Sequence, residues 1–247
     1  MDKKNDIKVT CIIPAYNEAK TISGVVKVCL QTPEIGEIIV VNDGSTDRTS
    51  EKLKKIKTIK VINLAKNHGK GYAVSRGIKA SKFQYLLFLD ADLTNFFPHH
   101  LFSLISPITS GRVDMTIADL KASFFKPRSA IWPFSGQRCF PKKLLLPLLK
   151  EIAKSKYGLE FTLNERFKNK RVIVIPWISE KELYLKKPKK QNDWLANYIK
   201  EIWEVTQAAI KTRSKIYRKK TKDQLIKNLS KYLKINIKKI EKYFKDF

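Results

Sequence analysis

The chain has 247 residues and a mass of 28.6 kDa, enough for one large domain or for a domain with an appendage. Hydrophobic residues make up 43% and charged residues 30% of it, so we expect a buried core and exclude wholesale disorder. Fifty Lys and Arg residues against 23 Asp and Glu give a net charge of +27, which indicates a polyanionic partner: a nucleic acid, an anionic membrane surface or a phosphorylated substrate.

Cysteine usage and apolar run length bear on the cellular compartment. Cys11, Cys29 and Cys139 form no CxxC spacing, which argues against a zinc site or a disulfide framework and suits a reducing cytosol. The charged residues 1–6 lead into a strand-like run without the apolar core of a signal peptide. Apolar stretches such as Leu144 to Leu149 are far shorter than the ~18 residues of a membrane span. We therefore expect a cytoplasmic or peripheral protein.

Short apolar runs alternate with helical patterns over the first 90 residues. The runs are rich in β-branched or aromatic residues, as buried strands are, and cover Val9–Pro14, Ile38–Val41, Ile59–Leu64 and Tyr85–Leu89. Between them, the sequence predicts helices over Thr21–Leu30, Asp47–Ile56 and Gly71–Ala80. This alternation predicts an α/β fold with a parallel sheet and right-handed crossovers.

The pattern becomes less regular after residue 92. The sequence predicts helices over Pro98–Ser106, Lys142–Lys154 and Leu159–Asn169. It predicts strands over Met115–Ala118 and Arg171–Pro176, and an irregular loop over Phe124–Pro133. A lysine-rich run at 186–190 indicates a boundary between a main domain, residues 1–185, and a basic tail, residues 186–247. The tail holds 19 basic and 6 acidic residues, a net charge of +13.

Polar residues follow each of the first four predicted strands, where open parallel sheets bind their ligands. The segments are Pro14-Ala15-Tyr16-Asn17-Glu18, Asn42-Asp43-Gly44-Ser45, Asn67-His68-Gly69-Lys70-Gly71 and Asp90-Ala91-Asp92. Tyr16 and Glu18 would stack on and hydrogen-bond a nucleoside, or form a plain turn and a first-turn acid. Four such segments at one edge predict a pocket for a polar, phosphorylated ligand.

Each segment also has an ordinary structural interpretation. Asp90 and Asp92 would repel each other unless Mg²⁺ or Mn²⁺ lay between them, but DxD spacing alone more often marks two solvated aspartates in a turn. Gly69-Lys70-Gly71 opens a helix and favours phosphate, although a glycine turn with an exposed lysine is the better explanation of this segment taken alone. Asp43 either accepts hydrogen bonds from a base or ribose or caps the next helix. Their convergence on one edge favours the binding site.

In order, spacing and strand position, these segments resemble the motifs of family-two glycosyltransferases with the GT-A fold over residues 7–95. The turn at 69–71 is most similar to the dolichol-phosphate mannosyltransferase and glucosyl-phosphoglycerate synthase branches. The resemblance implies a Rossmann-like, mainly parallel sheet flanked by helices, a nucleotide-sugar donor and a divalent metal (Mg²⁺ or Mn²⁺). The implied donor contacts are Tyr16, Glu18 and Asp43 for the nucleoside, Lys70 for the diphosphate, and Asp90 and Asp92 for ribose and metal. Pro14 and Ala15 are further implied substrate contacts.

The acceptor half, residues 96–185, has weaker motifs. Ser135-Gly136-Gln137-Arg138 is similar to a Ser-Gly-x-x motif that those branches carry after the DxD, and Tyr157-Gly158-Leu159-Glu160 is similar to the Gly-x-Glu segment that follows it. The chain departs from those branches in its short loop over Phe124–Pro133. It also lacks an obvious Glu-Asp pair, which many inverting members use as the base.

The missing base bears on the acceptor. A hydroxyl acceptor needs a carboxylate to remove its proton, whereas a phosphate acceptor is already ionised and needs only cations to bind it. Arg128 and Arg138 are candidate phosphate contacts, with Gln137 beside them, although ordinary ion pairing is an equal alternative for each arginine. Glu160 is a candidate base, or merely a helix-start acid. The candidate catalytic residues are therefore Asp92, Arg138 and Glu160.

The tail shows helical periodicity from Trp194 to Tyr217, with further segments from Thr221 and after Asn236. Lysine-rich faces bordered by Trp and Tyr are typical of helices that lie in a membrane interface, although a helical appendage packed on the main domain is the alternative. No recognised nucleic-acid motif accompanies the charge, so we expect no nucleic-acid partner.

Together these features predict a metal-dependent glycosyltransferase. It would transfer a sugar from a nucleotide sugar to a polyprenyl (dolichyl or undecaprenyl) phosphate as a peripheral protein at the cytoplasmic face of the cell membrane. One alternative is the same donor chemistry on a soluble phosphorylated or hydroxyl acceptor. A basic nucleic-acid-binding module is the non-enzymatic alternative, but it leaves the carboxylates at the ligand edge unexplained.

Overall fold

The computed structural model describes residues 7–120, 135–155, 158–177 and 183. The chain divides into two units between Lys186 and Lys187, so every described residue belongs to the first unit. The predicted loop over Phe124–Pro133, with Arg128, lies outside the described residues, as does the whole basic tail. The predicted domain boundary after residue 185 stays a prediction.

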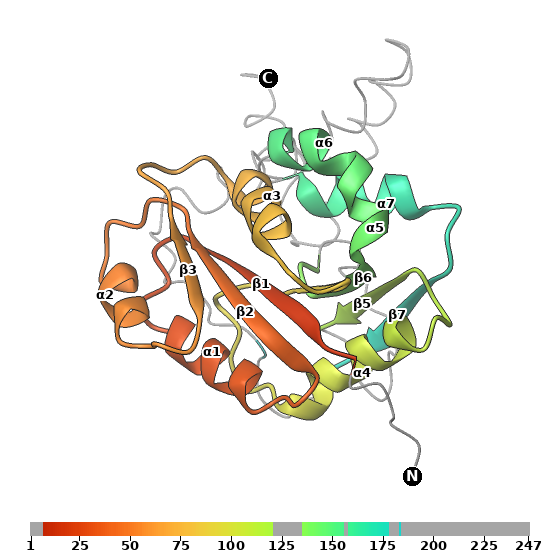
Figure 1. The fold of residues 1–247 in the computed structure, drawn as a ribbon, viewed down its shortest axis with the longest axis horizontal. Coiled ribbons are helices and arrows are strands. Elements are labelled where there is room, and N and C mark those ends of the chain that lie inside the picture. The colour runs from red at the N-terminus through yellow and green to blue at the C-terminus, as the bar shows by residue number, and fades with distance from the viewer. Residues whose placement is uncertain (1–6, 121–134, 156–157, 178–182, 184–247) are drawn as a thin grey trace, which may run out of the picture. The chain divides into compact units, whose positions relative to one another are not determined.

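Seven strands of the described residues form one sheet in the order β3-β2-β1-β4-β6-β5-β7 (Figure 1). Their bounds are β1 Val9–Ala15, β2 Ile35–Asn42, β3 Lys60–Asn63, β4 Tyr85–Phe88, β5 Met115–Asp119, β6 Arg138–Pro141 and β7 Val172–Pro176. All neighbouring strands are parallel except that β6 runs antiparallel to β4 and β5. This confirms the predicted α/β fold with a mainly parallel sheet. The strand order reverses between β1 and β4, which is the point where open sheets bind ligands.

Helices cover both faces of the sheet (Figure 1). α1, α2 and α4 contribute to one hydrophobic cluster, and α3, α5, α6 and α7 contribute to another on the opposite face. Their bounds are α1 Ile22–Leu30, α2 Thr49–Lys54, α3 Lys70–Ala80, α4 Pro98–Thr109, α5 Lys142–Leu145, α6 Leu149–Lys154 and α7 Leu159–Phe167.

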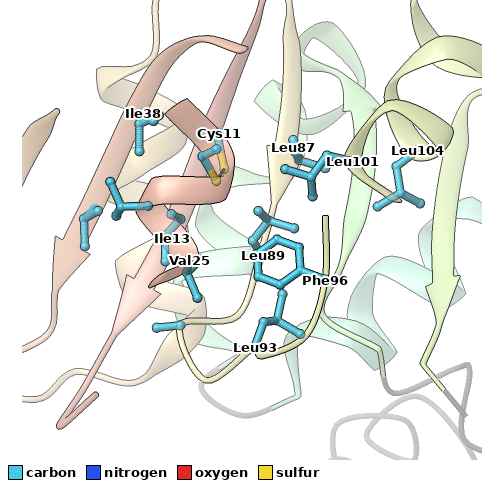
Figure 2. Packing of buried hydrophobic residues seen from close by; sticks show 14 of the residues in the cluster. Cys11, Ile13, Val25, Ile38, Leu87, Leu89, Leu93, Phe96, Leu101 and Leu104 are labelled. Atoms are coloured by element: carbon cyan, nitrogen blue, oxygen red, sulfur yellow. Dashed lines mark hydrogen bonds between the residues drawn. The ribbon is translucent and has the colours of Figure 1, made fainter. Parts of the chain in front are cut away.

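The central strand β1 shows why the sheet needs a helical layer on each side. Successive side chains of a strand point to opposite faces, and β1 carries buried apolar side chains on both. Cys11 and Ile13 pack in one cluster with Val25 of α1 and Leu101 of α4 (Figure 2). Ile12 belongs to the other cluster, with residues of α3, and all three strand residues are fully buried.

A glycine lets α3 pack closely on β1. A Cβ atom at Gly77 would overlap the Cγ2 atom of Ile12, so only glycine fits this approach of helix to strand. The helix begins at Lys70, just beyond the carboxyl end of β3. The close packing therefore helps to fix the position of Lys70 at the predicted ligand edge.

Two elements of the second half differ from the sequence prediction. β6 was not predicted, because four residues that begin with an arginine and end with a proline show no strand periodicity. The single helix predicted over Lys142–Lys154 is two helices, α5 and α6, separated by a 3₁₀ turn at Leu146–Leu148. Pro147 lies in that turn, and its missing N–H and its ring prevent a continuous α-helix.

Candidate active site

Asn17 connects the loop after β1 to the loop after β2. Its backbone N–H donates to Ser45 Oγ at 2.9 Å. Its side-chain Oδ1 accepts from the backbone N–H groups of Thr46 at 2.8 Å and Asp47 at 3.3 Å. Asn17 has a φ of 57°, a left-handed conformation that Asn adopts more readily than most residues. Tyr16, next to it, is 41% exposed, so the predicted nucleoside-stacking ring is accessible.

Asp47 makes a second connection between the same two loops. Its Oδ2 accepts from Ala19 N–H at 3.1 Å, and its Oδ1 accepts from the N–H and hydroxyl of Thr49 at 2.9 and 2.5 Å. The Thr49 hydroxyl in turn accepts from Glu18 N–H at 2.8 Å. Burial opposes the charge of Asp47, but the bonds from Thr49 and Ala19 outweigh it and lower the pKa of the Asp47 carboxyl. The predicted nucleoside contact of Glu18, which is 9% exposed, stays a prediction.

Asp43 connects the loop after β2 to the loop after β3. Its Oδ1 accepts from His68 N–H at 2.9 Å and its Oδ2 accepts from Gly69 N–H at 2.8 Å. Gly69 has a φ of 93°, which a residue with a side chain rarely adopts. Asp43 is 2% exposed, and its own N–H donates to the Ala15 carbonyl at 2.8 Å. It therefore holds the turn that begins α3, while its predicted contact with the nucleoside stays a prediction.

Lys70 connects the loop after β3 to the loop after β4 and to α7. Its Nζ lies 2.5 Å from Asp90 Oδ1 and 2.5 Å from Glu160 Oε1. Burial would lower the pKa of Lys70, but the two carboxylates outweigh it and raise this pKa. Burial would likewise raise the pKa of Asp90, but Lys70, Gln137 and Arg138 outweigh it and lower this pKa. Asp90 is therefore ionised and Lys70 protonated at neutral pH.

Arg138 is fully buried behind this ion cluster. Its Nε donates to the Ser135 carbonyl at 2.8 Å and its Nη1 to Asn164 Oδ1 at 2.7 Å. Burial lowers the pKa of Arg138 to about 10, opposed in part by the charges of Glu160 and Asp90. In this conformation the guanidinium serves neighbouring protein groups, and its predicted contact with a phosphorylated acceptor stays a prediction.

Asp90 and Asp92 are suited to a metal that is shared with a substrate. No group of three or more His, Cys, Asp and Glu side chains in the described ranges is placed to hold a metal by itself. Mg²⁺, however, is commonly bound by one or two carboxylates together with substrate phosphates. Asp90 is ionised for the reasons above, and the half-buried Asp92 follows it by two residues. The residues present thus fit Mg²⁺ or Mn²⁺ if a diphosphate supplies the remaining oxygen ligands.

The structure brings most of the predicted site residues to the carboxyl edge of the sheet. Pro14 and Ala15 end β1, and the loops that follow β1 to β4 are connected through the contacts described above. Glu160 and Gln137 join them from the acceptor half, whereas Arg128 lies outside the described residues. The sequence reasoning missed the bonding roles of Asn17, Asp47, Thr49, Ser135 and Asn164. Asn17 and Ser135 lie within the quoted motifs, but Asn164 has no sequence signal.

Comparisons of sequence place the chain among known proteins. Residues 10–161 match the family described as Glycosyl transferase family 2. The poly-beta-1,6-N-acetyl-D-glucosamine synthase of Staphylococcus aureus is 38% identical over 102 residues, which are 37% of this chain and 25% of that protein. An uncharacterized glycosyltransferase of Rickettsia bellii is 46% identical over 90 residues, 35% of this chain and 13% of that protein. The matches thus span a quarter or less of these curated relatives.

Solved structures with the same fold cover more of the chain. Glucosyl-3-phosphoglycerate synthase of Mycobacterium tuberculosis, in complex with Mg²⁺ and uridine diphosphate, has a TM-score of 0.63 at 18% identity, covering 82% of this chain and 79% of that one. TarS 1–349 of S. aureus has a TM-score of 0.57 at 19% identity, covering 86% and 68%. These likenesses show the fold, and the family match covers more than half of the chain. The chain belongs to glycosyl transferase family 2 and has the GT-A fold.

Proposed function

We propose that the chain transfers a sugar from a nucleotide-sugar donor to a phosphorylated acceptor, with the help of Mg²⁺ or Mn²⁺. The observation that carries this proposal is the continuous set of contacts between the four strand-end loops. Asn17 bonds to Ser45, Asp43 bonds to Gly69, and Lys70 pairs with Asp90. A preorganised edge with an accessible tyrosine, a lysine at a helix N-terminus and two nearby carboxylates suits a nucleoside diphosphate and its metal.

The proposed roles follow from the chemistry of each side chain. Tyr16 provides a ring on which a base stacks. Lys70 binds the diphosphate through its ammonium group, and this contact replaces one of its two carboxylate contacts. Asp90 and Asp92 hold the metal, which when bound offsets the charge that develops on the departing nucleoside diphosphate. Solved structures with the same fold, in complex with uridine diphosphate and Mg²⁺ or Mn²⁺, support this assignment.

A phosphorylated acceptor agrees with the state of the candidate base. Glu160 is 8% exposed and its Oε1 is 2.5 Å from the ammonium of Lys70, so this ion pair already occupies one of the two oxygens with which Glu160 could take a proton from a hydroxyl. A phosphate acceptor needs no such base. The solved M. tuberculosis synthase in complex with phosphoglyceric acid supports the phosphorylated class.

Within that class we propose a polyprenyl phosphate, met by a peripheral protein at the cytoplasmic face of the cell membrane. The net charge of +27 and the aromatic, lysine-rich tail support attraction to an anionic surface. Among the described residues, none of the helices combines the length and apolar character needed to cross a bilayer. A soluble phosphorylated acceptor is the other outcome that the experiment below separates.

The test is a screen of donor turnover with the full chain. UDP-glucose, UDP-N-acetylglucosamine and GDP-mannose are each supplied with Mn²⁺ or with EDTA, and nucleoside diphosphate release is measured alone, with undecaprenyl phosphate in detergent and with 3-phosphoglycerate. We expect one donor to turn over with Mn²⁺ only, and faster with undecaprenyl phosphate. Stimulation by 3-phosphoglycerate instead would identify a soluble acceptor. No Mn²⁺-dependent release from any donor would contradict the proposal.

A further inference from the structure

The antiparallel strand β6 brings Gln137 beside Asp90, although 47 positions separate the two in sequence. In the pairing of β4 with β6, Phe88 lies opposite Arg138. Since the strands run in opposite directions, the residues just before Arg138 lie next to those just after Phe88. The backbone there is fixed from the other side too, because Ala118 N–H of β5 donates to the Gln137 carbonyl at 3.0 Å.

The Gln137 side chain connects Asp90 to Ser135. Its Nε2 donates to Asp90 Oδ2 at 2.8 Å, and its Oε1 accepts from Ser135 Oγ at 2.8 Å. An ionised carboxylate only accepts hydrogen bonds, so the amide must turn its NH₂ group toward Asp90. The Ser135 hydroxyl then donates to the amide oxygen, and this bond holds the amide in the same orientation. Gln137 is fully buried and Ser135 is 9% exposed.

We propose that Gln137 is a positioning residue that fixes the Asp90 carboxylate for metal binding, with Ser135 fixing the orientation of Gln137. This inference rests on the proposed function. Asp90 has a different partner on each oxygen: Lys70 at Oδ1 and Gln137 at Oδ2. The Lys70 side chain is 24% exposed and has a flexible four-carbon stem, so it can turn toward a diphosphate. Gln137 is fully buried and cannot turn away in this manner, so it keeps Asp90 in place when Lys70 moves toward the diphosphate.

Gly136 makes the same arrangement dependent on the backbone. A Cβ atom at Gly136 would lie 2.5 Å from Oδ1 and Oδ2 of Asp90 and 2.5 Å from Nζ of Lys70. The main chain therefore lies directly against the ion pair, and a side chain at this position would push both groups away. All three residues of the Ser-Gly-Gln segment thus act on the orientation of one carboxylate.

The test compares Q137M, S135A, the double variant and a matched control, Q84M. Methionine keeps the length of glutamine but removes the donor, and Gln84 is exposed and outside the site. For the full chain, calorimetry measures UDP affinity with Mn²⁺ and, separately, with EDTA. Donor turnover and thermal unfolding are followed on the same samples. The metal-free affinity is the reference that a general structural defect would lower as well.

We expect Q137M to lose ~10–100-fold in Mn²⁺-dependent UDP affinity and in turnover, the range typical when a partner of a metal-binding carboxylate is removed. Its UDP affinity in EDTA should stay within about twofold of wild type, as should all values for Q84M. S135A should show a smaller loss in the same direction. Because both residues act through one amide, the double variant should resemble Q137M rather than add the two losses.

The outcomes separate this inference from the proposed function. A wild-type chain that binds UDP no better with Mn²⁺ than with EDTA overturns the proposed function and the positioning role together. If wild type binds UDP more tightly with Mn²⁺ and Q137M binds it equally well, the positioning role alone is overturned. The same holds if Q137M loses as much UDP affinity in EDTA as it does with Mn²⁺. If Q137M does not fold, S135A decides: a wild-type response to Mn²⁺ overturns the role, and a reduced one supports it.

Discussion

The ammonium of Lys70 lies 2.5 Å from Oδ1 of Asp90, which joins the first residue of α3 to the end of β4. The same ammonium reaches Glu160 on α7, so one lysine holds together carboxylates from the donor half and the acceptor half of the chain. This cluster connects the stability of the site to its proposed chemistry. The position of the lysine at a helix N-terminus also makes it a ready partner for phosphate.

Replacing Lys70 should therefore affect both stability and donor binding. We expect Lys70→Met to lower the free energy of unfolding by about 2 kcal/mol, less than for a fully buried pair because both side chains keep some exposure. It leaves Asp90 and Glu160 without their shared cation. Urea unfolding measures the first effect, and calorimetry with UDP measures the loss of affinity. Lys168→Met, which breaks an exposed pair with Glu165, is the matched control and should be near neutral.

Stability should depend on pH through Asp47. Its pKa is lowered in the folded state, so it stabilises the fold above the unfolded value of 3.8, and this contribution is lost as the pH falls through the folded pKa. The Asp47→Asn variant should therefore have a lower free energy of unfolding than wild type at pH 7, by no more than about 1 kcal/mol at this exposed position. The difference should narrow as the pH falls below 3.8, because Asp47 then becomes protonated in the folded state as well.

Thermal unfolding at pH 7, 5 and 3 checks the Asp47 prediction. Glu51→Gln removes a carboxylate from the nearby helix α2 while leaving the bonds of Asp47 in place, and it should unfold close to wild type. If Asp47→Asn lowered the unfolding temperature by the same amount at all three pH values, Asp47 would not stabilise the fold through its charge, and the prediction would be contradicted.

The packing of α3 on β1 predicts opposite effects for two glycines. Gly77→Ala should destabilise by about 1–3 kcal/mol, because its Cβ would overlap Ile12 in a tightly packed layer. Gly24 lies in α1 with nothing within 4 Å of an added Cβ, so Gly24→Ala should stabilise by about 0.5–1 kcal/mol. Urea denaturation of both variants tests the pair. Equal effects would mean that α3 does not depend on this close approach.

Membrane attachment is a prediction about the basic tail. Each Lys or Arg near an anionic surface contributes about 1 kcal/mol, and this attraction is screened over ~8 Å at physiological ionic strength. The full chain should sediment with vesicles containing phosphatidylglycerol but not with pure phosphatidylcholine, and added salt should release it. Replacing Lys186, Lys187, Lys189 and Lys190 by Gln should weaken sedimentation at least about tenfold. Unchanged sedimentation of that variant would contradict a role for this lysine run.

The first half of the fold was predictable because each element carries its own local signal. β1 is apolar on both faces, as a buried central strand must be, and α3 follows a glycine turn. β6 had no such signal, since its four residues are in a strand only because β4 and β5 lie on either side. The single helix predicted over 142–154 is interrupted at Pro147. Pro147 is a local signal for this break, but the prediction gave more weight to the amphipathic pattern around it.

The site was likewise predictable only in part. The residue types at the sheet edge follow from the sequence, because each motif comes directly after a predicted strand. Their partners do not: Asp43 bonds to backbone N–H groups, and Lys70 reaches a glutamate 90 positions away. The burial of Arg138 likewise depends on where β6 and α7 meet. Such contacts arise from the tertiary arrangement, which periodicity and spacing do not encode.

The most direct test of the account is the metal dependence of donor turnover in Asp92→Asn. Asp92 is half-buried in a loop at the ligand edge, so its replacement should leave the fold intact, which circular dichroism verifies. Wild type should release nucleoside diphosphate from its donor with Mn²⁺ and stop in EDTA. The variant should lose at least ~100-fold in turnover with Mn²⁺, since the proposed metal offsets the charge of the leaving group. Turnover by Asp92→Asn at the wild-type rate, or in EDTA, would contradict the account.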